Sequence, residues 1–112
     1  MTDLADAIIP YAQLKLTSDS SAEIAPAEAL EAEVAAAMLT RVVRRAAAAA
    51  AGEQSVEPVS VAVDVTGEAK AGETIQFTTH IDRKTRTIIF ANGEARAAGR
   101  PMLTAICVYR IV

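Results

Sequence analysis

The chain has 112 residues, of which 52% are hydrophobic and 22% are charged, and its formal net charge at pH 7 is -3. A chain of this length can bury one hydrophobic core but not two, so we expect a single domain over residues 1–112. The mild negative charge argues against a general nucleic-acid binder, which needs clustered positive charge against phosphates. The high apolar content favours self-association, because a second subunit would cover part of the apolar surface.

Cysteine content and the apolar pattern favour a cytoplasmic protein. Cys107 is the only cysteine in the sequence, so no intramolecular disulfide can form and a reducing compartment is expected. It lies in an apolar run, which predicts a buried, unreactive thiol. The first residues lack the basic region of a signal peptide, and no apolar stretch reaches about 20 residues without a charge. We therefore expect no membrane association.

The segment before residue 27 has weak periodicity. Residues 3–9 are compatible with a short helix that Pro10 would end, and residues 11–17 alternate as a strand does. The Ser-Asp-Ser-Ser run at 18–21 and the Ala-Pro-Ala run at 25–27 are typical of loops. The sequence leaves open whether this segment completes a sheet.

A long helix is predicted for residues 27–51. Its apolar residues recur at every fourth position, at Leu30, Val34, Met38 and Val42. Pro26 suits the first helical turn, and Gly52 suits the cap that ends a helix. The acidic residues of this segment lie near its start and its three arginines toward its end, which complements the helix dipole.

After Gly52 the apolar period changes to two, which predicts four antiparallel strands. Residues 59–65 alternate valine with small or polar residues, so this strand is expected to bury one face. Three more strands are predicted at residues 75–82, 86–96 and 102–111. The last two are apolar on both faces and should be central, which leaves the valine strand as the better candidate for an edge.

The order of elements, a strand, a long helix and four strands, resembles the hotdog-fold acyl-thioester family. The similarity is strongest in residues 59–112, where Val-Ala-Val-Asp-Val-Thr precedes Ala-Lys-Ala-Gly-Glu-Thr-Ile, and Asn-Gly-Glu-Ala-Arg precedes Gly-Arg-Pro-Met-Leu-Thr-Ala. The resemblance implies an α+β hotdog fold, in which a long central helix is wrapped by a curved antiparallel β-sheet. It also implies an acyl-CoA thioesterase-like homodimer, joined through residues 59–65, that binds and can hydrolyse an acyl thioester at the subunit boundary.

The resemblance also indicates candidate site residues. Many thioesterases of the family carry a His-Gly-Gly stretch before the helix and an acid within it, whereas this chain reads Ile-Ala-Pro-Ala at 24–27 and Met-Leu-Thr-Arg-Val at 38–42. Glu33 is the nearest acid and the candidate for directing water, with backbone amides at residues 27–29 polarising the carbonyl. The candidates for binding coenzyme A phosphates are Arg41, Arg44 and Arg45. For both groups, ordinary solvated surface charge is the alternative interpretation.

Several alternatives stay open at this point. The missing motif favours a non-catalytic hotdog-fold dimeric binding or structural module, and a dehydratase or hydratase would have to use His80, the only histidine. A single histidine also argues against a metal site, and no cofactor is expected. The sequence does not decide the acyl group, whether coenzyme A or an acyl carrier delivers it, or whether dimers pair further into a tetramer.

Overall fold

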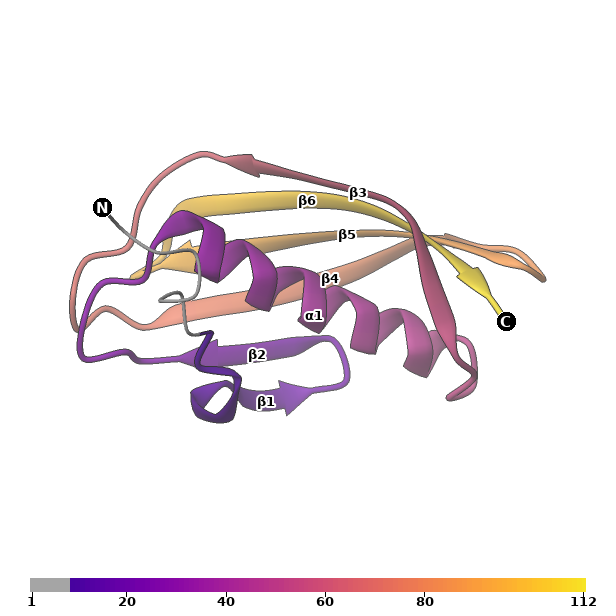
Figure 1. Cartoon of the computed structure of the whole chain (residues 1–112), viewed down its shortest axis with the longest axis horizontal. Helices are drawn as coiled ribbons and strands as arrows, with labels where there is room; N and C mark the ends of the chain where they lie inside the picture. Colours follow the sequence, from indigo (N-terminus) through magenta and orange to yellow (C-terminus); the bar gives the residue numbers. More distant parts are fainter. Residues whose placement is uncertain (1–8) are drawn as a thin grey trace, which may run out of the picture.

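The structure is a computed structural model that describes residues 9–112 (Figure 1). A long helix, α1 (Ala32–Ala50), lies across one face of a curved, six-stranded antiparallel sheet. The strands follow the sheet order β1-β2-β4-β5-β6-β3. Their bounds are β1 (Lys15–Ser18), β2 (Ser21–Ile24), β3 (Val56–Val65), β4 (Ile75–Lys84), β5 (Ile88–Ala97) and β6 (Arg100–Ile111). The predicted arrangement of one helix on an antiparallel sheet is therefore confirmed, with β5 and β6 central as expected.

The segment before the helix adds two short strands to the four that were predicted. The strand predicted for residues 11–17 is only half right, because a 3-10 turn, η2 (Tyr11–Gln13), precedes β1. The pairing of β2 with β4 was not predicted, and it brings Ala22 opposite Phe77, so that both side chains are buried. The helix predicted for residues 3–9 lies outside the described residues, apart from Ile9, which is not helical.

The helix begins at Ala32 and not at residue 27, so its predicted start was wrong. The carbonyl of Pro26 accepts a hydrogen bond from the Gly72 amide at 3.2 Å, and it is used there in place of an intrahelical bond. The predicted cap at Gly52 is confirmed, since this glycine has φ 71 and the Glu53 amide donates to the Ala48 carbonyl at 2.8 Å. That 6→1 bond is a Schellman cap, which satisfies carbonyls of the last turn.

The core lies between α1 and the concave face of the sheet. Its largest fully buried side chains include Met38, Leu39, Phe77, Ile89 and Tyr109. Helix and sheet approach closely at Gly93, where an added Cβ would lie 2.6 Å from Val43 Cγ2. Cys107 is buried as predicted, and burial raises the pKa of its thiol, which keeps it protonated.

The edge position of β3 is confirmed, but its valine face is not buried within the chain as predicted. Val61 and Val65 are 47% and 61% exposed, although their register opposite Cys107 and Leu103 places them on the same face as α1. The physical reason is the position of the helix, which lies over the middle of the sheet and covers β3 only in part, so that Val56 is buried and Val63 is half-buried (Figure 1). Within residues 9–112, no helix combines the length and apolar character needed to cross a membrane.

Candidate functional site

Three depressions are lined by residues of α1, and two of them adjoin. The first, which we call the basic depression, has a volume of about 470 Å³ and is lined by Arg41, Arg44 and Arg45 of α1 together with residues 53–56. The second, the tyrosine pocket, has a volume of about 200 Å³ between α1 and β3. The third, the helix-start depression, has a volume of about 540 Å³ and borders residues 29–32, which end at the first residue of α1, and the loop after β3.

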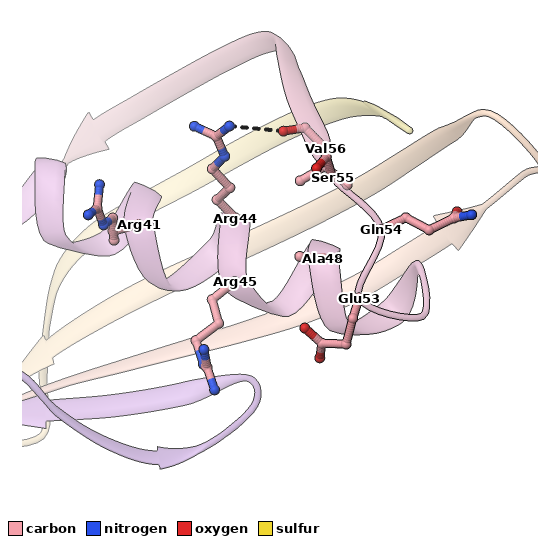
Figure 2. Close-up of a pocket in the computed structure, with 8 residues that line it drawn as sticks. All are labelled: Arg41, Arg44, Arg45, Ala48, Glu53, Gln54, Ser55 and Val56. Atoms are coloured by element: carbon pink, nitrogen blue, oxygen red, sulfur yellow. Dashed lines mark hydrogen bonds between the residues drawn. The ribbon is translucent and has the colours of Figure 1, made fainter. Parts of the chain in front are cut away.

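The structure brings the three candidate arginines to one depression, because residues three and four apart share a helix face (Figure 2). Their side chains nevertheless point in different directions. Arg44 Nη2 donates to the Val56 carbonyl at 3.0 Å, whereas Arg45 turns toward the β1–β2 hairpin, where Asp19 Oδ1 is 4.0 Å away. The Arg45–Asp19 pair is exposed and therefore weak, so a ligand anion can compete for this arginine.

The tyrosine pocket shares Arg41 and Arg44 with the basic depression. The Arg41 guanidinium lies 4.7 Å above the centre of the Tyr11 ring, a cation–π contact that forms the outer wall. At the inner wall, the Tyr109 hydroxyl donates to the Thr40 carbonyl at 3.5 Å. Burial raises the pKa of Tyr109 well above its ordinary range, so the phenol remains a neutral hydrogen-bond donor.

Sequence reasoning missed both tyrosines of this pocket. Tyr11 was assigned to a strand, and Tyr109 was one of several apolar residues of the last strand. The only available signal was their aromatic character, since the chain has two tyrosines in all. No local pattern indicates that residues 11, 41 and 109 meet.

The helix-start depression is lined by Leu30, Glu31, Val65 and Glu68, among others. The first intrahelical amide bond comes from Ala35, which donates to the Glu31 carbonyl at 3.0 Å. The three preceding amides, at residues 32–34, therefore have no intrahelical acceptor. The amides expected at residues 27–29 precede the helix instead, so that expectation was wrong.

Glu33 lies exposed in the first turn of α1 and does not line the three depressions. Eleven residues of helical rise separate its Cα from that of Arg44 by about 16 Å along the axis. One chain alone therefore does not bring the candidate acid and the candidate arginines together. A ligand that contacts both in one subunit would have to be long, or the two groups would have to come from different subunits.

His80 lies away from these depressions, on the sheet face opposite α1. Its Nε2 is 3.9 Å from Asp82 Oδ1, which also accepts a hydrogen bond from Asn92 Nδ2 at 2.7 Å. The histidine side chain is 76% exposed. Because a hydratase needs its histidine in a pocket, the geometry gives that alternative no support. No cluster of three metal-binding side chains occurs within residues 9–112.

No protein-family model matches the sequence, and no curated protein sequence matches it. Solved structures with low sequence identity share its fold. Thioesterase superfamily member 2 from Mus musculus is 17% identical, with 88% of this chain and 80% of that chain covered and a TM-score of 0.72. A phenylacetic acid degradation-related protein from Ralstonia eutropha is 16% identical, with 95% and 93% covered and a TM-score of 0.73.

A protein from Bacillus halodurans, solved with CoA, is 9% identical to this chain, with 89% and 72% covered and a TM-score of 0.77. At such low sequence identities the structural similarity establishes the fold only, and any chemistry has to be argued from the residues of the site. The chain therefore has the hotdog fold of thioesterase superfamily structures, which confirms the fold predicted from the order of its elements.

Proposed function

We propose that the protein is a cytoplasmic, homodimeric acyl-CoA thioesterase. The observation that carries the proposal is the placement of two different depressions at the two ends of β3, an edge strand that pairs with β6 on one side and has no neighbouring strand on the other within residues 9–112. Val56, at the start of β3, lines the basic depression, and Val65, at its end, lines the helix-start depression. One depression suits phosphates and the other suits a thioester carbonyl.

In the proposed dimer, the β3 strands of two chains pair antiparallel about a two-fold axis. This pairing satisfies the free backbone groups of the edge and covers Val61 and Val65. Antiparallel pairing also places the start of one β3 beside the end of the other. The basic depression of one subunit then lies next to the helix-start depression of its partner, and each site uses both chains.

The proposed chemistry follows from the pairing of a basic depression with the helix-start depression of the other subunit. Arg41, Arg44 and Arg45 of one subunit bind the phosphates of coenzyme A through charge-assisted hydrogen bonds. The free amides at residues 32–34 of the other subunit polarise the thioester carbonyl, where negative charge develops during attack. Glu33 takes a proton from water as the water oxygen bonds to the thioester carbon. The carbon–sulfur bond then breaks and Glu33 returns the proton to sulfur, which gives the carboxylic acid and the coenzyme A thiol.

Ligand-induced thermal stabilisation tests the proposal, with thiol release followed in the same samples. Coenzyme A, acyl-CoAs of several lengths and an acyl-carrier thioester serve as ligands. A ligand held at about a hundred times its dissociation constant adds ~2.7 kcal/mol of stability. Binding with thiol release supports a thioesterase, and binding without release supports the non-catalytic module. Preference for the carrier thioester over acyl-CoA would identify the carrier as donor. If none of the ligands binds, the proposal fails.

A further inference from the structure

The tyrosine pocket carries more positive charge than an apolar acyl chain requires. Arg41 and Arg44 form one side of it, and no acidic side chain lines it among the described residues. The opposite side is apolar and includes Pro58 and Val61. Guanidinium groups beside a wall of low polarity attract an anion more strongly than they would in open water, and their planar geometry matches a carboxylate.

Tyr109 adds a neutral donor to the same pocket. The residue is only 1% exposed, and its bond to the Thr40 carbonyl, at 3.5 Å, is at the long limit for a hydrogen bond. A hydroxyl held so weakly can turn toward a ligand oxygen at little cost. The pocket therefore offers two cationic groups and one hydroxyl to an acceptor that enters between α1 and β3.

We infer that the tyrosine pocket is an acyl-end subsite that selects short acyl groups ending in a carboxylate, such as glutaryl. The inference rests on the proposed function, because it places the thioester at the helix start of the same subunit. Arg41 and Arg44 of that subunit then hold the acyl carboxylate, and its Arg45, which does not line the tyrosine pocket, is left for the phosphates of the second ligand in the dimer. Ala37 lines the pocket and follows Ala32 by five residues, or about 8 Å of helical rise. The volume of about 200 Å³ has room for about six water-sized groups, which fits a short chain and excludes a long fatty acyl group.

The test compares glutaryl-CoA with pentanoyl-CoA, which has the same chain length and lacks the carboxylate. Dissociation constants are measured by calorimetry for the full chain and for Tyr109→Phe, which keeps the ring and removes the donor. One hydrogen bond to a charged group corresponds to about a tenfold change in affinity. We expect glutaryl-CoA to bind at least about tenfold more tightly than pentanoyl-CoA, and Tyr109→Phe to remove most of that difference while leaving pentanoyl-CoA unchanged.

Two further variants control the comparison. Ser55 lines the basic depression and not the tyrosine pocket, so Ser55→Ala should change both affinities equally. Ala37 lines the pocket from α1, is half-buried and does not belong to the proposed β3 contact, so Ala37→Asp places a negative charge in the pocket and leaves the dimer contact unchanged. This variant should abolish the preference for glutaryl-CoA, and it keeps the inference testable if Tyr109→Phe does not fold.

Free glutarate tests whether the pocket binds a carboxylate that is not attached to coenzyme A. Equal affinity for the two acyl-CoAs, with both bound, overturns the subsite and leaves the proposed function intact. If no CoA compound binds, the proposed function fails; glutarate binding that Tyr109→Phe abolishes would still support a carboxylate pocket. Failure of glutarate as well as both acyl-CoAs to bind overturns the subsite.

Discussion

Arg100 donates two hydrogen bonds to the carboxylate of Glu73, at 2.7 and 2.6 Å, and ties the start of β6 to the loop between β3 and β4. The Lys70 amide donates to the same carboxylate at 2.7 Å. These donors hold the pKa of Glu73 at about 2, below its ordinary value of 4.5, with the Arg100 bond as the largest cause. The pair is the best-defined ion pair of the described residues, because Nη1 and Nη2 of one guanidinium each contact a different oxygen of one carboxylate.

This pair predicts a pH-dependent contribution to stability. Because the folded-state pKa is depressed, the contribution is fully present above about pH 4.5 and is lost as pH falls toward about 2. Glu73→Gln should therefore lower the free energy of unfolding at pH 7, and the difference from wild type should shrink as pH falls through that window. Urea denaturation at a series of pH values measures it.

Glu57→Gln is the matched control for Glu73→Gln. It removes the partner of Arg110, in a pair whose side chains are 51% and 59% exposed. Exposed pairs contribute little, so this variant should change stability by less than the Glu73 variant does. Equal losses in the two variants, or a Glu73 effect that does not vary with pH, would contradict the interpretation.

A second prediction concerns the close approach of α1 and β5. Gly93→Ala would place Cβ 2.6 Å from Val43 Cγ2 and 3.1 Å from Leu39 Cδ1, so these side chains or the backbone around them would have to shift. Overpacking of this kind costs about 1–3 kcal/mol in the free energy of unfolding. Val43→Ala removes the obstructing methyl groups, so the double variant should be less destabilised than the sum of the two single variants. Strictly additive losses of stability would show that the contact with Val43 is not the cause of the destabilisation by Gly93→Ala.

A third prediction tests the proposed dimer. Val61→Lys combined with Val65→Lys would place like charges across the two-fold axis, so we expect dissociation to monomers. Ile106→Lys is the control, because Ile106 is 66% exposed but lies on the opposite face of the sheet. Sedimentation analysis reports the mass of each variant. A monomeric wild type at micromolar concentration, or equal dissociation by Ile106→Lys, would refute pairing through β3.

A fourth prediction concerns the proposed base. Glu33→Gln should lower kcat by about 100-fold or more, the range typical of a lost general base. Its fold should be unchanged, because the side chain is exposed. Glu28→Gln, in the exposed loop before α1, should leave kcat at the wild-type value. Full activity in Glu33→Gln would remove this residue from the mechanism.

A fifth prediction separates phosphate binding from surface charge. Arg45→Gln should weaken binding of free coenzyme A and make it less dependent on salt. Asp19→Asn releases Arg45 from its 4.0 Å ion pair and should leave binding unchanged or strengthen it. Calorimetry at low and high salt measures both effects. Unchanged coenzyme A binding in Arg45→Gln would show that Arg45 is an ordinary surface charge and does not bind the phosphates.

The sequence by itself determined the long helix, apart from its start, and the four strands that follow it. Periods of about four and of two are local properties, and so is the glycine that caps a helix at Gly52. The alternation of valines also identified β3 as the edge. Local patterns did not determine the start of α1, because the Pro26 carbonyl accepts a hydrogen bond from the amide of Gly72, a residue far along the chain.

Tertiary structure alone decided the tyrosine pocket. The tyrosine pocket forms because η2, α1 and β6 bring Tyr11, Arg41 and Tyr109 together. Contacts between residues so distant in sequence leave no periodic signal along the chain. The exposure of Val61 and Val65 in β3 was also decided by packing, because one helix is too narrow to cover all six strands of the sheet. No single segment of the sequence encodes this property.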